Sequence, residues 1–225
     1  MNIAPAMLWA PAAQPPELRP NELHLWRALC PQDATGMSSH LSPEEWLRAS
    51  RFVFETDRRR FIFARGILRT ILGRYLDCPP AALRFTTGPN GKPSLAFPEC
   101  ALRFNVSHSE DLVLLAVAHR QEVGVDVEWM RENMPFEDLA EQWFDPRDAW
   151  QIRILSRPEK KRRFFESWTL LEAGVKATGA GLGRAWETLC PSRWSQFAFA
   201  PEEGFAAALA VEGRDHHIRS YTWQS

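Results

Sequence analysis

The sequence lacks any long apolar run, and no stretch approaches the roughly 20 consecutive apolar residues that a membrane-spanning helix needs. Its first 20 residues have no basic stretch ahead of the apolar part, and prolines interrupt that part, so a signal peptide is a poor interpretation. We therefore expect an extended N-terminal arm over residues 1–20, no membrane partner and a cytoplasmic location.

Strong net charge and paired cysteines are also absent. The formal net charge is −1, which argues against a general nucleic-acid-binding protein and leaves any phosphate binding to local basic patches. Cys30, Cys78, Cys100 and Cys190 are scattered without a C-x-x-C pair, so they are expected to be reduced thiols. No nucleophile elbow or triad order is present, which makes serine-hydrolase chemistry a poor fit.

Apolar residues with regular periodicity are abundant. The 225 residues are 45% hydrophobic, which is enough for a real core. Helical spacing predicts long amphipathic helices over 57–77 and 158–178, and a capping-box pattern at Ser42 and Glu45 predicts a helix over 42–52. Shorter helices are expected near 136–143 and 146–155. Strands are expected at 22–26, within a hairpin over 102–118, and at 122–129, 194–201, 204–212 and 217–223.

These elements predict an α+β protein made of two similar halves related by a pseudo-twofold axis. Each half is expected to hold a small, mainly antiparallel sheet packed with a long helix. The N-terminal half would comprise residues 21–119 and the C-terminal half residues 120–225. The active site is expected in the cleft between the two halves.

Two acids stand out in the strand "EVGVDVEWM" at residues 122–130. Asp126 and Glu128 alternate with valines, so they point the same way, roughly 7 Å apart along the strand. One interpretation is a solvated outer face. The other is a shared cation, because neighbouring carboxylates repel unless positive charge lies between them, and Mg²⁺ prefers such oxygen ligands.

Other candidate residues are ambiguous on their own. Glu172 and Lys176 lie one turn apart at the border of the second long helix, where an ordinary surface ion pair is the simpler interpretation. Arg58, Arg65 and Arg69 border the apolar stripe of the first long helix and are either solvated or phosphate-binding. The loop "GPNGKP" with Lys92 is either a plain turn or an anion-binding loop, and His108 at a hairpin mouth is either structural or functional.

Four segments carry a resemblance to a known family: "GKP" (91–93), "FNVSHS" (104–109), "VGVDVE" (123–128) and "FFESWTLLEAGVKATGAGL" (164–182). In this order they resemble the 4′-phosphopantetheinyl transferase family, of the longer, monomeric, surfactin-synthetase-activating type. The segments "ELHLW" and "RRRFIFARGILRTILG" extend the likeness over roughly residues 22–212.

The resemblance implies that the phosphopantetheine arm of coenzyme A is transferred to a serine of an apo acyl or peptidyl carrier protein, with release of 3′,5′-ADP. It implies a monomer and a Mg²⁺ ion held by Asp126, Glu128 and Glu172. It leaves the general base open between Glu172 and a water held by the metal. The implied catalytic residues are Glu172, Lys176 and His108. The implied coenzyme A contacts are Arg60, Arg65, Lys92, Pro93, Ser107, His108 and Lys176.

The sequence departs from the family pattern at three positions. Leu171 stands where the family has a lysine, Gly174 where it has an aromatic residue, and Asp148 where relatives often have glutamate. Restoring a lysine at 171 is predicted to improve the use of coenzyme A, unless position 171 serves packing.

Two other functions remain open beside an active transferase. One is a weak homologue that binds coenzyme A or a carrier protein, and the other is a Mg²⁺-dependent nucleotide phosphoesterase. The carrier could belong to fatty acid, polyketide or non-ribosomal peptide synthesis.

Overall fold

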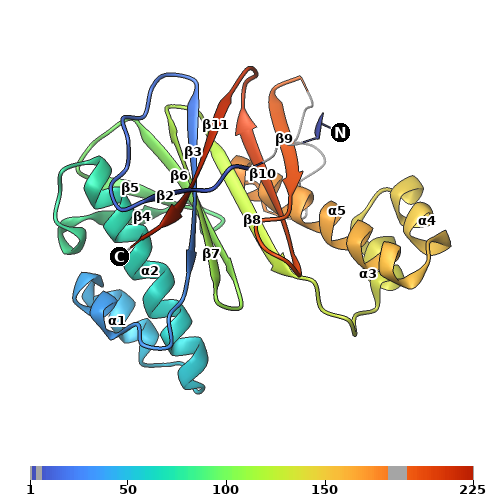
Figure 1. The fold of residues 1–225 in the computed structure, drawn as a ribbon, viewed down its shortest axis with the longest axis horizontal. Helices are drawn as coiled ribbons and strands as arrows, with labels where there is room; N and C mark the ends of the chain where they lie inside the picture. Colours follow the sequence, from blue (N-terminus) through green and yellow to red (C-terminus); the bar gives the residue numbers. More distant parts are fainter. Residues whose placement is uncertain (1, 4–6, 182–191, 225) are drawn as a thin grey trace.

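The computed structural model describes residues 2–3, 7–181 and 192–224 (Figure 1). It has an α+β fold, which confirms the predicted class. Two main sheets lie side by side, and each is packed with one long helix, α2 (Glu55–Tyr75) or α5 (Arg157–Thr178). Cys190 lies outside the described residues. Within the described part of the chain, no helix combines the length and the apolarity that crossing a membrane requires.

The first sheet has five strands in the order β2-β11-β3-β7-β6. Their bounds are Ala10–Ala12, His217–Trp223, Glu22–Leu29, Leu112–His119 and Leu102–Ser109. Apolar residues on one side of α2, among them Ile67, Leu68 and Ile71, pack with Trp26 and Phe104 of this sheet in the largest core cluster. Smaller elements surround α2: η1 (Thr35–His40), α1 (Pro43–Ala49), η2 (Pro80–Ala82) and the hairpin of β4 (Arg84–Thr87) and β5 (Pro93–Phe97).

The second sheet has four strands in the order β1-β9-β10-β8. Their bounds are Asn2–Ile3, Trp194–Phe199, Phe205–Glu212 and Val123–Trp129. Small residues let α5 lie close to this sheet: Ala173 and Ala177 of α5 pack against Ala208 and Ala210 of β10. The helices α3 (Phe136–Trp143) and α4 (Pro146–Ile154) cover the other side of α5 and enclose a separate aromatic cluster.

Local sequence signals placed most of these elements within one or two residues. The capping box at Ser42 and Glu45 is formed, with both reciprocal hydrogen bonds, and α1 begins at Pro43 but ends at Ala49 rather than at residue 52. Gly179 ends α5 in the left-handed conformation at φ 66°, which glycine adopts without strain. The predicted loop before residue 93 turned out to be the connection of the β4–β5 hairpin.

A row of polar side chains joins the two sheets where β6 runs beside β8. Asn105 Oδ1 accepts a hydrogen bond from Val125 N at 2.9 Å, and Ser109 Oγ accepts one from Trp129 N at 3.0 Å. Ser107 Oγ lies between them, 3.4 Å from Val127 N. Alternate residues of β6 therefore accept hydrogen bonds from backbone N–H groups of β8 that no neighbouring strand uses. We call this row, formed by Asn105, Ser107 and Ser109 along β8, the seam.

The two ends of the chain cross between the sheets. The strand β11 at the C-terminal end pairs in parallel with β3, in the sheet of the N-terminal half, and β2 pairs with β11. At the other end, β1 pairs with β9 in the C-terminal sheet. The two sheets thus exchange strands across the predicted division at residue 120. The expected N-terminal arm is tied to both sheets.

A buried polar group lies in the core of the first sheet. His24 is fully buried, with Nδ1 2.7 Å from the hydroxyl of Tyr75, and that hydroxyl also accepts a hydrogen bond from Trp26 Nε1 at 2.9 Å. His24 Nε2 is buried without a hydrogen-bond partner and lies 3.6 Å from Glu22 Oε2. Burial lowers the pKa of His24 to about 4, although the Glu22 carboxylate opposes this shift.

The stability of the fold should therefore fall in acid. A histidine with pKa about 4 in the fold and 6.5 in the unfolded chain favours folding fully above pH 6.5, and this contribution is lost as the pH falls toward 4. The loss amounts to about 3 kcal/mol at 1.36 kcal/mol per pKa unit. Urea unfolding between pH 7 and 4 would measure it. His24→Gln should flatten the profile, whereas His217→Gln, at an exposed position, should not.

Candidate active site

The two acids of β8 point into the seam, both on the same side of the strand. Asp126 is only 2% exposed, and its Oδ1 accepts a hydrogen bond from Ser107 Oγ at 2.9 Å. Glu128 Oε2 accepts one from Ser109 Oγ at 3.1 Å. The solvated-face interpretation is therefore wrong for Asp126. The alternate polar residues of the "NVSHS" segment therefore have a structural role. Asn105, Ser107 and Ser109 bond to the backbone of β8, and the two serines also bond to its acids.

A lysine from the C-terminal half completes this cluster. Lys176 of α5 lies 2.5 Å from Asp126 Oδ1 and 3.1 Å from Ser107 Oγ. Its partner is thus Asp126, across the helix–strand interface, rather than Glu172 one turn away on the same helix. Glu172 is half-buried beside them, and the charges of Lys176 and Asp126 both affect its pKa.

All three carboxyl groups are unfavourably placed for carrying charge. Burial raises the pKa of Asp126, of Glu128 and of Glu172. The charge of Asp126 raises the pKa of the other two further, whereas Lys176 opposes the shift in each of the three. Added positive charge near these oxygens would therefore stabilise their ionised forms.

One oxygen of this cluster has no partner. Asp126 Oδ2 is buried without a hydrogen bond. Hard carboxylate oxygens, one of them unpaired, fit a Mg²⁺ ion by ligand type. In the arrangement described here, however, no three acidic, histidine or cysteine side chains of the described residues gather closely enough to hold a metal.

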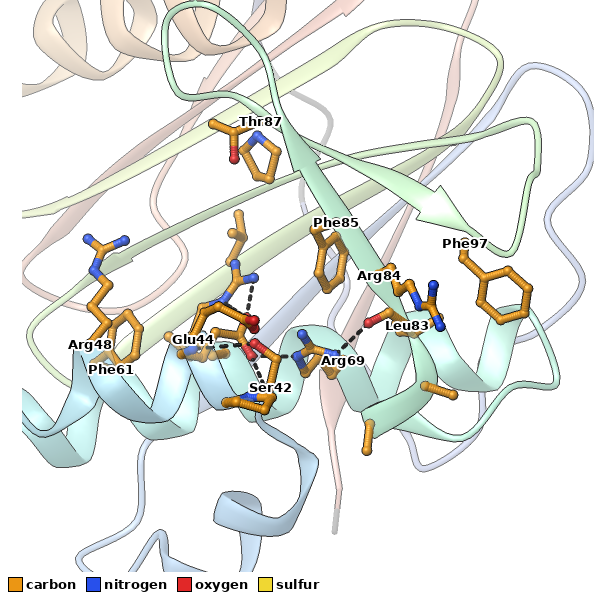
Figure 2. Close-up of a pocket in the computed structure, with 18 of the residues that line it drawn as sticks. Ser42, Glu44, Arg48, Phe61, Arg69, Leu83, Arg84, Phe85, Thr87 and Phe97 are labelled. Carbon is orange, nitrogen blue, oxygen red and sulfur yellow. Dashed lines mark hydrogen bonds and ion pairs between the residues drawn. The ribbon is translucent and has the colours of Figure 1, made fainter.

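A cavity of about 1130 Å³ opens in the N-terminal half, between α1, α2 and the β4–β5 hairpin (Figure 2). Aromatic rings and arginines alternate along its wall, with Arg48 over Phe61 at 5.1 Å and Arg69 over Phe85 at 5.0 Å. Its described lining residues all belong to the range 42–108. The site was expected in a cleft between the halves, but this cavity belongs to one half and only its edge at His108 approaches the seam.

An ion cluster in the cavity wall uses two of the predicted basic residues. Glu45 Oε2 accepts from Arg69 Nε at 2.6 Å, and Glu45 Oε1 accepts from Arg65 Nε at 2.6 Å. Arg69 is buried and also donates to the carbonyl oxygens of Pro80 and Leu83. Glu45 thus neutralises much of this basic edge, and Arg69 serves to hold α1 and the 80–83 segment against α2.

Arg48 is a cation of the cavity that no sequence pattern singled out. It lines the cavity opposite the hairpin, and no carboxylate pairs with it among the described residues (Figure 2). Its charge contributes to the environment of His108. Only its position on α1, three residues after the glutamate of the capping box, could have pointed to it, and nothing there separates it from a solvated arginine.

His108 lies at the edge of the cavity nearest the seam. It alternates with Ser107 and Ser109 along β6, so its ring points away from β8 and lines the cavity. Partial desolvation lowers the pKa of His108, and the positive charges of Lys176, Arg60 and Arg48 lower it further. These cations and the ring together form a region that would attract a phosphate group.

The other residues that the resemblance assigns to coenzyme A binding lie in different places. Pro93 lines the cavity, and Ser107 lies in the seam. Arg60 pairs with Glu110 at 2.8 Å and with Asp111 at 3.0 Å, outside the cavity lining. Lys92 is held by Glu122 and by a carbonyl oxygen of α5.

Two of the three departures from the family pattern have structural partners, and the third is buried. Leu171 is 5% exposed and packs in the aromatic cluster with Phe164 and Phe165. Gly174 is buried on the same helix, and Asp148 lies 3.5 Å from Arg163. The geometry at 171 favours the packing interpretation over a missing lysine.

Leu171→Lys should consequently weaken the fold without improving catalysis. Removing a core leucine and burying a charged chain end should lower the free energy of unfolding by about 2–4 kcal/mol. Thermal unfolding and steady-state kinetics with coenzyme A would test this. Leu171→Met, which conserves volume, should cost less than about 1.5 kcal/mol. A lysine variant that melts normally and turns over faster would contradict the packing role.

Comparison with family models matches nearly the whole chain. Residues 25–120 match the model described as 4′-phosphopantetheinyl transferase, N-terminal. Residues 122–223 match that of the 4′-phosphopantetheinyl transferase superfamily. The boundary between the two matches falls at the connection from β7 to β8.

Individual relatives agree with these matches. The chain is 38% identical over 222 residues to the 4′-phosphopantetheinyl transferase HetI of Nostoc sp., covering 91% of this chain and 94% of the relative. It is 25% identical over 162 residues to the 4′-phosphopantetheinyl transferase Sfp of Bacillus subtilis, covering 71% and 70%. It is also 29% identical over 155 residues to the L-aminoadipate-semialdehyde dehydrogenase-phosphopantetheinyl transferase of Mus musculus, covering 64% and 50%.

Proposed function

Because this chain belongs to the 4′-phosphopantetheinyl transferase superfamily, we propose that it moves the phosphopantetheine arm of coenzyme A to a serine of an apo carrier protein, with Mg²⁺ and with release of 3′,5′-ADP. The observation that carries the proposal is the cluster of Asp126, Ser107 and Lys176 at the seam, with one carboxylate oxygen unpaired.

The cavity suits the nucleotide end of coenzyme A. Its aromatic rings offer stacking surfaces for an adenine, and Arg48 offers a cation without a carboxylate partner among the described residues for a phosphate. Arg65 lies in the same wall, shared with Glu45. A nucleotide bound here would direct its diphosphate past His108 toward Lys176 and the acids of the seam.

The transfer needs placement and charge neutralisation more than covalent chemistry. The serine oxygen attacks the phosphorus that carries the pantetheine arm, and the bond from this phosphorus to the bridging oxygen of 3′,5′-ADP breaks. Lys176 and His108 hold the phosphate oxygens in line. Glu172, whose pKa burial raises, takes up the serine proton. Asp126, Glu128 and Glu172 would hold Mg²⁺, which would supply further neutralisation of the diphosphate.

A direct assay separates the three candidate functions. Coenzyme A, Mg²⁺ and an apo carrier protein are incubated with the enzyme, and the carrier is then weighed by mass spectrometry. A gain equal to the phosphopantetheine arm means transfer. Release of 3′,5′-ADP without that gain means hydrolysis, and binding of coenzyme A with neither product means a binding protein.

A carrier protein would dock on α4. Trp150 and Ile154, one turn apart, are 60% and 61% exposed, with Arg147 and Arg153 on the same short helix. Two aromatic residues that precede this helix are less accessible, since Trp143 is half-buried and Phe144 is buried. The surface thus combines exposed apolar side chains with two arginines, of which Arg153 pairs with Glu141, and it would suit a carrier protein of acidic character.

Trp150→Ala should raise the Michaelis constant for the carrier by about tenfold, because exposed aromatic anchors often dominate binding energy. The constant for coenzyme A should stay the same. Raising the salt concentration should weaken carrier binding in both proteins, since basic groups steer an acidic partner. If the Michaelis constant for the carrier changes with neither the substitution nor the salt concentration, the docking surface lies elsewhere.

A further inference from the structure

The loop at residues 88–92 connects β4 to β5 and reaches the end of α5 in the other half. Asn90 Nδ2 donates a hydrogen bond to the carbonyl oxygen of Gly179 at 2.7 Å. Lys92 Nζ donates to the carbonyl oxygen of Ala177, also at 2.7 Å. The side chains thus bind helix-end carbonyl groups that lie 85 and 89 residues further along the chain.

Such carbonyl groups need outside partners. The last four carbonyl groups of a helix have no intrahelical donor, and the helix dipole favours a cation at this end. Lys92 supplies both a donor and a charge. Its stem also packs beside Gly179, where a Cβ would lie 3.7 Å from Lys92 Cδ.

A carboxylate fixes the lysine in this position. Glu122 Oε2 accepts from Lys92 Nζ at 2.6 Å, and Glu122 Oε1 accepts from Arg103 Nε at 3.1 Å. Glu122 immediately precedes β8, and Arg103 lies on β6. Four segments therefore meet at one point: the loop, β6, the start of β8 and the end of α5.

The place where these four segments meet lies next to both parts of the proposed site, the cluster at the seam and the large cavity. Ala177 follows Lys176 directly, and Lys176 bonds to Asp126 and Ser107. On its other side the loop contributes Gly91 to the large cavity, which Pro93 also lines. A displacement of the loop would therefore reach the last turn of α5.

We propose that the loop is a latch and that Lys92 is a positioning residue, which holds the last turn of α5 so that Lys176 meets Asp126. Its ammonium group is already bound by Glu122 and Ala177, its side chain is 19% exposed, and it is absent from the described lining of the cavity. This assigns Lys92 a role other than the phosphate contact that the family resemblance implies. The inference rests on the proposed transferase function.

Two variants on opposite sides of the same ion pair test the latch. Lys92→Met keeps the apolar stem, and Glu122→Gln keeps the shape of the acid. Both should lower the turnover number by about tenfold, because small displacements of positioned groups reduce rates strongly. Both should leave the dissociation constants of coenzyme A and 3′,5′-ADP within about threefold. Amide hydrogen exchange at Lys176–Gly179 should become faster in both.

A matched control is Glu55→Gln, which removes an exposed ion pair with Arg58 and should change none of these quantities. The latch is wrong if Lys92→Met weakens nucleotide binding tenfold or more while Glu122→Gln changes neither binding nor exchange. It is also wrong if exchange at the end of α5 is unchanged in both variants. Should the wild-type protein fail to bind coenzyme A, the proposed function fails, and the exchange measurement still decides on the latch.

Discussion

Asp126→Asn should abolish transfer without weakening the fold. Asp126 is the most buried acid of the seam cluster, and it alone among the three acids bonds directly to Lys176. Removing its charge removes a proposed metal ligand and the partner of Lys176 together. Metal-assisted charge stabilisation is worth several kcal/mol, so the turnover number should fall by about a thousandfold or more.

The thermal stability of Asp126→Asn should not fall along with its activity. Burial raises the pKa of Asp126, which means that the fold disfavours its ionised form at neutral pH. Asparagine keeps the shape and removes that penalty. In metal-free buffer the midpoint of thermal unfolding should therefore stay level or rise.

Two measurements complete this test. Wild-type protein should gain thermal stability when Mg²⁺ and coenzyme A are added together, and Asp126→Asn should not. Asp33→Asn, which alters an exposed acid that accepts from Thr35 N, should behave as wild type in both assays. Normal Mg²⁺-dependent turnover in Asp126→Asn would remove this residue from the site.

Gly124→Ala should damage both the fold and the activity. A Cβ at this position would lie 2.1 Å from the carbonyl oxygen of Ala173 and 2.3 Å from Ala177 N, both backbone atoms of α5. No rotamer change can relieve a clash with backbone, so α5 would have to move away from β8. The unfolding free energy should fall by about 3 kcal/mol or more.

The same displacement carries Glu172 and Lys176 away from Asp126. We expect transfer to fall at least about a hundredfold even at temperatures where the variant is folded. Denaturant unfolding and turnover at 15 °C would separate the two effects. Gly36→Ala is the matched control, because a Cβ there meets no atom within 4 Å, and it should be close to neutral. A stable Gly124→Ala enzyme would show that α5 and β8 can separate without cost.

The sequence determined much of this fold because its signals were local. The two long helices, the capping box at Ser42 and the alternation around Asp126 each depend on a few neighbouring residues. The motif order identified the family, and the comparisons confirm it. Alternation also placed Asp126 and Glu128 on one side of β8.

What the sequence could not reveal depended on partners far along the chain. Glu45 binds Arg65 and Arg69 from another helix, so the basic edge of α2 looked freer than it is. The sequence left the loop of Lys92 open between a plain turn and an anion-binding loop, and it could not show that Lys92 binds Glu122 and the end of α5. The alternation of Asn105, Ser107 and Ser109 was visible, but its purpose required knowing that β8 runs beside β6.

Because β11 pairs with β3, the ribosome makes one strand of the first sheet long before its neighbour. Arg27 of β3 bonds to Thr222 of β11, and these residues are 195 positions apart. At ribosomal rates the strand β3 has been made roughly 10–40 s before its neighbour β11 exists. During that interval one edge of β3 remains open to pairing with other chains. A nascent chain must therefore shield β3 until β11 emerges, and a chain that lacks β11 (His217–Trp223) would keep the same open edge.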